Sequence, residues 1–167
     1  IKFMGIPVTG TIAQFQAKLV AKGCIYNKVA SATIPNGTRA FKGTFVGNKV
    51  DIFVYYDTKT KVVYRTKAVV SGVSKDIAEQ EYSKVKNLLS QKYVSDFDDI
   101  FVGTQGGKES VSFVSANDEG EINGLIDLFI TQDEETWVRA PYNYNLHIDY
   151  NDRINTNNHE NQQLDEI

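Results

Sequence analysis

Few side chains of this chain have the types and spacing that nucleophilic catalysis requires. Such catalysis needs a base beside a nucleophile, and the chain holds two histidines, His147 and His159, and one cysteine, Cys24. His147 alternates with Leu146 and Ile148, so we expect it on the sheet face opposite them. His159 lies in a polar tail. Nothing in the sequence links Cys24 to His147, and a small apolar residue at the start of a strand is the simpler interpretation of the cysteine.

Two acidic segments could supply paired carboxylates for hydrolysis or oxygen ligands for calcium. They are residues 96–99 and 133–135, and both have the composition of loops. A twelve-residue calcium loop with Gly120 at its sixth position would start at Ser115 and need an acid at Ile126, so it fails at both ends. We interpret both segments as solvated turns and predict no metal site, with a looser calcium site near residues 96–99 as the alternative.

Phosphate and nucleic-acid chemistry find little support. The segment 103–108, GTQGGK, is similar to a P-loop only superficially, because its glycine spacing is one residue short and Glu109 stands where Ser or Thr would hold magnesium. The basic residues that could share one sheet face are Lys42, Lys49, Lys59, Lys61, Arg65 and Lys67. The isoelectric point of about 5.4 opposes binding to phosphate. We therefore predict no cofactor and no nucleic-acid partner.

An aromatic segment around Pro141 is the best indication of binding. It contains Trp137, Arg139, Tyr142 and Tyr144. Trp, Tyr and Arg dominate protein interfaces because they bury a large area at a small cost in entropy, and Trp and Tyr also stack on sugar rings. We predict a ligand- or partner-binding site at these four residues, for an unknown protein partner or a glycan. The alternative is that Trp137 and a tyrosine close the bottom of the core.

Two amphipathic helices must position these groups. The first starts at Thr11, where Gln14 completes a capping box, and the second starts at Ser74. Their apolar stripes are Ile12, Phe15 and Leu19 in the first helix and Ala78, Tyr82, Val85 and Leu89 in the second. This spacing is typical of helices that cover one face of a sheet.

Strand patterns follow each helix. Alternating apolar residues predict antiparallel strands with one buried face. The expected strands are residues 24–32, 39–46, 49–56 and 62–70, and then 99–103, 109–115, 122–131 and 144–150. In strand 62–70 we expect Val62, Tyr64 and every second residue after them on one face, with Arg65 and Lys67 opposite. From residue 151 the chain is polar and predicts a short docking helix or a frayed tail.

Charge divides the chain at the point where the order of elements repeats. Residues 1–70 hold 11 basic and two acidic side chains, a net charge of +9, and residues 71–167 hold 7 and 19, a net charge of −12. We predict an α+β fold, with two helices packed on one face of a mostly antiparallel sheet, built from two tandem helix-then-strands units. The units are a basic 1–70 and an acidic 71–150 that share one core, followed by a tail or short helix at 151–167. The charge split indicates either docking between the units or a displayed surface.

Composition predicts a globular protein without a transmembrane segment. The hydrophobic fraction of 41% is enough for a core, and no apolar run approaches the ~20 residues of a membrane-spanning helix. The single cysteine leaves the compartment open. The chain starts at Ile1 rather than Met, which fits removal of an export signal or an otherwise trimmed chain.

The first segment also resembles a known group of proteins. Residues 3–11, FMGIPVTGT, with Phe15, Leu19 and Lys22-Gly23 behind them, are similar to the opening of uncharacterised exported proteins of Bacteroides-type gut bacteria. Segments 41–47 and 63–65 and the pairs at 81–82, 88–89 and 92–93 fit the same resemblance, which covers residues 1–93. It implies an exported protein of the periplasm or cell surface. The element order resembles the tandem α+β architecture of the β-lactamase-inhibitor-protein fold, from which no function follows.

These observations favour a non-enzymatic, exported protein-binding module. We expect it to act through the sheet face that the helices leave open, where polar and aromatic side chains alternate. The alternative is a carbohydrate-binding or carbohydrate-processing accessory protein of the cell envelope, which would use the same aromatic residues. An enzyme is the third possibility and would need a polar cluster in a cleft.

Overall fold

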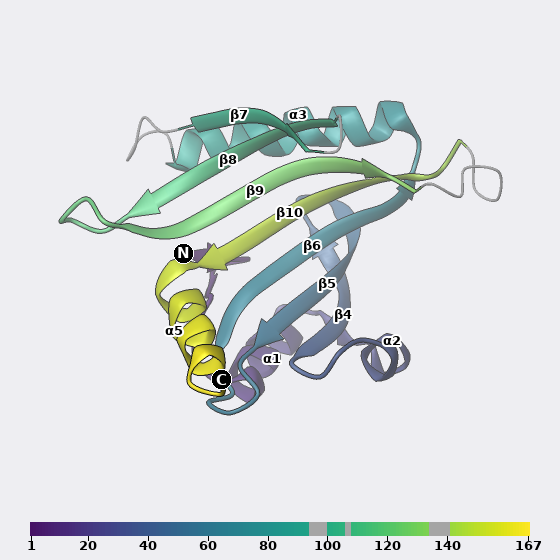
Figure 1. Ribbon diagram of the computed structural model, residues 1–167. Helices are drawn as coiled ribbons and strands as arrows, with labels where there is room; N and C mark the ends of the chain where they lie inside the picture. The colour runs from purple at the N-terminus through teal and green to yellow at the C-terminus, as the bar shows by residue number, and fades with distance from the viewer. Residues whose placement is uncertain (94–99, 106–107, 134–140) are drawn as a thin grey trace.

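Two successive runs of helix and strand make up the chain, for which a computed structural model describes residues 1–93, 100–105, 108–133 and 141–167. The first run comprises β1 (Lys2–Phe3), β2 (Ile6–Pro7), α1 (Ile12–Ala21), β3 (Ile25–Tyr26), α2 (Lys28–Thr33), β4 (Thr38–Phe45), β5 (Asn48–Tyr56) and β6 (Val63–Val73). The second comprises α3 (Lys75–Tyr93), β7 (Ile100–Gln105), β8 (Lys108–Ala116), β9 (Ile122–Gln132), β10 (Tyr144–Asp152) and α5 (Arg153–Leu164). Figure 1 shows the two runs side by side.

A single eight-stranded antiparallel sheet joins the two runs. Its strand order is β3-β4-β5-β6-β10-β9-β8-β7, so the last strand of each run meets in the middle and β3 and β7 form the edges. The pairing of β6 with β10 is in register from Leu146↔Val70 to Asn151↔Arg65. The basic and acidic parts of the chain therefore meet along this central pair. The residue boundaries predicted for the two units, at 70 and 150, remain predictions.

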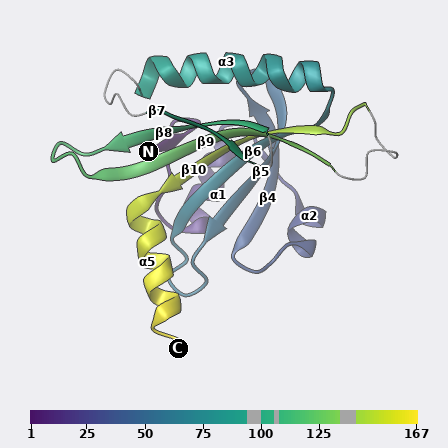
Figure 2. The same cartoon turned by 45° about the horizontal axis from the view of Figure 1, so that its top comes forward.

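One face of the sheet is covered by α1 and α3, as the apolar stripes predicted (Figure 2). The capping box of α1 is present, since Thr11 Oγ1 accepts a hydrogen bond from Gln14 N at 3.3 Å and Gln14 Oε1 accepts one from Thr11 N at 3.1 Å. Phe15 is 1% exposed and Leu19 0%. Burying each such side chain stabilises the fold by roughly 1.5–3 kcal/mol. Because helices pack on a face of an antiparallel sheet, the predicted α+β fold class is confirmed.

The predicted strand at 24–32 is wrong beyond its first residues. Only Ile25 and Tyr26 form strand β3, and the chain then enters helix α2. Asn27 caps this helix, because its Oδ1 accepts a hydrogen bond from Ala30 N at 3.1 Å. The side chain of Ser31 then ties α2 to β4 by accepting from Ala40 N at 2.9 Å. A local cap and one contact with the sheet therefore outweigh a weak strand pattern.

A β-bulge overturns the predicted face assignment at the start of β6. Tyr55 pairs with Arg65 but Tyr56 pairs with Val63, which leaves Tyr64 as the extra residue. Val63 is fully buried in the core, whereas we predicted Val62 and Tyr64 on the core face. A bulge inserts one residue and so reverses the alternation on one side of it. Beyond the bulge, Arg65 and Lys67 lie on the predicted face.

The polar tail forms helix α5, the first of the two predicted alternatives. Asp152 caps it by accepting a hydrogen bond from Asn155 N at 2.8 Å. None of its residues is buried, and Asn155 Nδ2 donates to the carbonyl oxygens of Val8 and Val63 at 3.2 and 3.1 Å. This helix is therefore held on the protein by polar contacts rather than by an apolar stripe.

Candidate functional site

The aromatic segment predicted as a binding site is only partly described by the structure. Tyr142 is 60% exposed, whereas Tyr144, at the start of β10, is partly buried and packs against the core. Tyr144 also lines a hollow of about 480 Å³ beside the start of α3. Trp137 and Arg139 lie outside the described residues. Of the two described residues, Tyr142 faces solvent and Tyr144 is mostly a packing residue.

The structure separates the two residues that a cysteine nucleophile would need. Cys24 belongs to the core under α1 and α3, where burial raises the pKa of its thiol. Leu146 and Ile148 lie in the same core, so His147, which alternates with them, lies on the opposite face as predicted. Cys24 and His147 are therefore on opposite sides of the sheet and cannot act together.

The acidic segments and the glycine-rich segment lie largely outside the described residues. This holds for residues 96–99, 134–135 and 106–107. Asp133 is described, and its Oδ1 accepts a hydrogen bond from Asn145 Nδ2 at 3.1 Å. Within the described ranges, no three His, Cys, Asp or Glu side chains gather into a group that could hold a metal ion.

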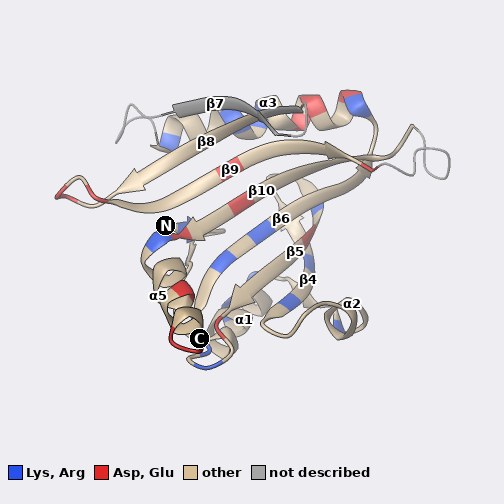
Figure 3. Ribbon diagram, viewed as in Figure 1, with Lys and Arg blue, Asp and Glu red and all other residues tan. Residues whose placement is uncertain are grey.

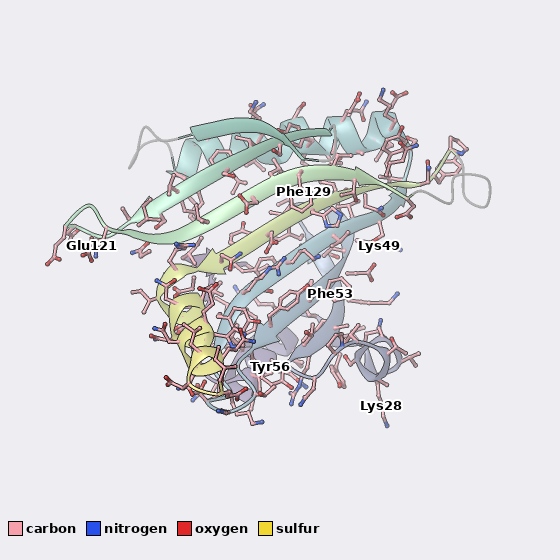
Figure 4. The ribbon with its side chains drawn as sticks, in the orientation of Figure 1. Lys28, Lys49, Phe53, Tyr56, Glu121 and Phe129 are labelled. Atoms are coloured by element: carbon pink, nitrogen blue, oxygen red, sulfur yellow. The ribbon has the colours of Figure 1, made fainter. Side chains whose placement is uncertain are left out.

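The sheet face opposite α1 and α3 carries polar and aromatic side chains where the two runs meet. Register places Phe53, Lys67, Asp149 and Asp127 in one row across four strands, and Asp51, Val69, His147 and Phe129 in the next. We define the open-face cluster as Phe53, Arg65, Lys67, Phe129, His147 and Asp149. Figure 4 shows Phe53 on β5 and Phe129 on β9, on either side of the central pair β6 and β10.

An ion pair fixes the centre of the open-face cluster. Arg65 Nε donates to Asp149 Oδ1 at 2.8 Å and Arg65 Nη2 donates to Asp149 Oδ2 at 2.5 Å. The Asp149 residue is 5% exposed, and the Arg65 guanidinium lies 4.5 Å from the centroid of the Tyr55 ring. Bidentate pairing is the geometry in which a buried carboxylate is best compensated. The pair joins β6 to β10, and Figure 3 shows blue segments on β6 and a red segment on β10.

Lys67, next to this pair, is a cation without a comparable partner among the residues that the structure describes. Its Nζ lies 5.7 Å from the centroid of the Phe53 ring. Burial lowers the pKa of Lys67, and the charge of Asp149 opposes this shift only in part. The carboxylate of Asp149 is engaged by Arg65, and the described residues form no ion pair with Lys67. Its ammonium group is therefore partly desolvated and incompletely compensated.

His147 lies next to Asp149 on the same face of β10, diagonally across from Lys67, and is held neutral. Its ring stacks on Phe129, with 4.7 Å between centroids and 4° between planes, and its Nε2 lies 2.7 Å from Thr131 Oγ1. Burial lowers the pKa of His147 to about 4, with the positive charge of Lys67 as a second cause. The buried Nδ1 has no hydrogen-bond partner among the described residues. At neutral pH the ring is therefore an uncharged, planar neighbour of the Lys67 ammonium.

The second histidine, His159 of α5, contacts residues near the start of β6. His159 of α5 stacks on Tyr64 at 4.2 Å between centroids, and its Nδ1 lies 2.8 Å from Asp57 Oδ2. Burial raises the pKa of Asp57, but hydrogen bonds from Thr60, His159 and Lys59 outweigh it and lower the value to about 2. Asp57 also orders its own turn, so we interpret this contact as a clamp that holds α5.

Sequence reasoning found parts of the open-face cluster but not the cluster itself. Alternation placed Arg65, Lys67 and His147 on a polar face, yet it could not show that β6 lies beside β10. The partners Arg65 and Asp149 are 84 residues apart in sequence. The usable signal was the repeated element order, because the last strands of two tandem units are candidates for the pair at the middle of a shared sheet.

Comparisons with known proteins identified no relative of this chain. None of the described helices is both long enough and apolar enough to cross a membrane. Searches with protein-family models, against curated proteins and against solved structures found no match.

Proposed function

We propose that the protein is a non-enzymatic protein-binding module whose binding surface is the open-face cluster. The observation that carries this proposal is the partly buried, incompletely compensated ammonium of Lys67, between the Phe53 ring and a neutral His147. A partly desolvated cation is costly when alone and gains when a partner supplies a carboxylate. The preferred partner therefore presents an Asp or Glu to the centre of the sheet.

The surroundings of Lys67 suit a protein interface. Aromatic and Arg side chains contribute most binding energy at such interfaces, and Phe53, Phe129 and Arg65 are each partly exposed on this face. The Arg65–Asp149 ion pair is already formed, so binding does not need to order these two side chains. A site that is arranged in advance loses less entropy on association.

Carbohydrate binding is the second candidate, and the exposed ring of Tyr142 is the observation that favours it. The open-face cluster itself suits sugar stacking less well. Lys67 covers one face of the Phe53 ring, and His147 covers one face of the Phe129 ring. A sugar would therefore use Tyr142. A glycan array with wild type and Tyr142→Ala tests this alternative, and binding that depends on Tyr142 would replace the protein-binding proposal.

Site-specific photo-crosslinking tests the protein-binding proposal. A benzophenone amino acid replaces Phe53 in one variant and the exposed Asn87 of α3 in the control, and both are irradiated in extract of the source cells. We expect one dominant crosslinked partner with the probe at position 53 and none at 87. Adding Lys67→Gln should abolish that crosslink. Equal crosslinking at both positions, or no effect of Lys67→Gln, would refute the proposal.

Export is part of the proposal and rests on the resemblance of residues 1–93 to exported proteins. Fractionation of the source cells, with an antibody against this chain, tests it. We expect the protein in the periplasmic or surface fraction. Recovery with the cytoplasmic marker proteins would remove export from the proposal without affecting the binding surface.

A further inference from the structure

The edge of the sheet at β4 is only half covered. β4 has eight residues, but β3 pairs with Lys42 and Phe41 alone, and the residues before β3 come from α1. No strand in the described part of the chain pairs with Gly43, Thr44 and Phe45 on that side. Thr44 is exposed. An uncovered strand edge is a template on which another extended chain can pair.

The hairpin between β4 and β5 determines which backbone groups this edge offers. Phe45 pairs with Asn48 across a two-residue turn in which Val46 and Gly47 both have positive φ, so Phe45 exchanges its backbone hydrogen bonds with β5. Alternate residues of an antiparallel strand bond to opposite neighbours. The N–H and C=O of Thr44 therefore point away from β5, in line with β3, where a further strand could accept and donate.

Lysine side chains surround this uncovered edge. A hollow of about 440 Å³ there is lined by Ile25, Lys42, Gly43, Thr44, Lys49 and Asp51, among others. Register places Lys42, Thr44 and Lys49 on one face of the sheet, and the two lysines are exposed. Lys28 and Lys49 both lie on the side of the molecule that carries α2 and β4 (Figure 4).

Basic side chains outnumber acidic ones among the residues that line this hollow, where Asp51 stands beside Lys42 and Lys49. Residues 1–50 contain seven basic side chains and no Asp or Glu. The carboxylate of Asp51 accepts a hydrogen bond from Ser71 Oγ at 3.1 Å. The apolar Ile25, which is 70% exposed, stands at the rim of the hollow. The edge therefore combines free backbone groups, positive charge and one apolar contact.

We propose that this edge is a second binding site, separate from the open-face cluster, which takes an extended acidic segment of a partner protein as an added strand. The segment pairs with Thr44 and continues the line of β3. Its residue opposite Thr44 points to the face that holds Lys42 and Lys49, so that residue is Asp or Glu. Its backbone hydrogen bonds provide affinity, and the lysines select for acidic sequences.

Fluorescence anisotropy with defined peptides tests this site. The probe is a fluorescein-labelled peptide of alternating Glu and Val, and its control has Lys in place of Glu. We expect only the acidic peptide to bind. Lys42→Glu with Lys49→Glu should weaken its binding by at least about tenfold. The control Lys75→Glu with Lys92→Glu makes the same change in net charge on α3 and should leave binding unchanged.

A second variant isolates the backbone contribution. Thr44→Pro removes an N–H that the sheet does not use, so the fold should tolerate it at this edge, while strand addition should be lost. Hydrogen exchange of the Thr44 amide should slow when peptide binds wild type. The lysine substitutions could weaken peptide binding while Thr44→Pro leaves it unchanged and peptide does not slow exchange of the Thr44 amide. In that case the contact is not strand addition and the proposal is overturned.

Two further outcomes would also overturn it. Phosphatidylserine vesicles that bind through Lys42 and Lys49 while the peptide does not would identify a membrane surface. Self-association that Thr44→Pro abolishes, without peptide binding, would identify a second copy of this chain as the occupant. Sedimentation of protein with vesicles and light scattering of protein alone distinguish these cases.

Discussion

The neutral His147 should make the stability of the protein depend on pH in a predictable direction. Its pKa is about 4 in the folded protein, against 6.5 for the unperturbed side chain. In the unfolded chain His147 binds a proton below about pH 6.5, but in the folded protein it resists protonation until about pH 4. The folded state therefore binds fewer protons in this window. Stability is present above about pH 6.5 and falls as the pH is lowered toward about 4.

The size of the effect follows from the shift. One pKa unit corresponds to about 1.4 kcal/mol, so the lowering from 6.5 to about 4 would be worth about 3 kcal/mol for a fully buried ring. His147 is only partly buried, and solvent screening reduces the expected contribution to roughly 1–2 kcal/mol. That is a measurable fraction of the 5–15 kcal/mol that is typical of a folded domain.

The substitution His147→Gln tests this pH dependence. It removes the titrating imidazole and keeps a polar group near Thr131. Urea unfolding followed by circular dichroism gives the free energy of unfolding of both proteins at several pH values from about 4 to about 7. We expect the variant to be less stable at pH 7, and this difference to shrink by roughly 1–2 kcal/mol at pH 4.

A matched control separates this histidine from the other groups that titrate in the window. His159→Gln leaves His147 in place and should keep the contribution of His147 to the pH dependence. The reasoning is refuted if the difference in unfolding free energy between wild type and His147→Gln does not change with pH. It is also refuted if nuclear magnetic resonance titrates the His147 ring near its unperturbed value.

Further predictions concern the ion pair, the core and the clamp. Arg65→Ala should destabilise the protein by about 3 kcal/mol because it leaves Asp149 buried and unpaired, and Arg65→Ala with Asp149→Ala should cost less than the sum of the two single changes in chemical unfolding. Gly43→Ala should cost about 1–3 kcal/mol because its Cβ would lie 2.8 Å from Cys24 Sγ, and adding Cys24→Ala should restore part of the loss in thermal unfolding. Asp57→Ala should cost about 1–3 kcal/mol and increase hydrogen exchange within α5, whereas slow exchange there would contradict the clamp. Raising sodium chloride from low to molar concentration should lower thermal stability by screening attraction between the basic and acidic runs, and an unchanged melting temperature would mean that this attraction contributes little.

Local sequence determined helices α1 and α3 and most strands of this protein. Thr11 and Gln14 form the capping box, and the alternation of apolar residues located β4, β5, β9 and β10 to within a few residues. These features depend on neighbours one to four positions away, so they can be read from the chain itself. The prediction failed where one residue interrupts such a pattern, at the Asn27 cap and at the bulge that carries Tyr64.

Tertiary structure alone decided the open-face cluster. Arg65 and Asp149 become partners because β6 pairs with β10, and nothing local specifies that pairing across 84 residues. The partial burial that lowers the pKa of Lys67 and of His147 likewise arises from neighbours on other strands. Periodicity determines which face of a strand a side chain occupies, but only strand order and register determine which side chains share its environment. Charge state and contacts depend on that environment, and this is why the sequence predicted an open polar face without its cluster.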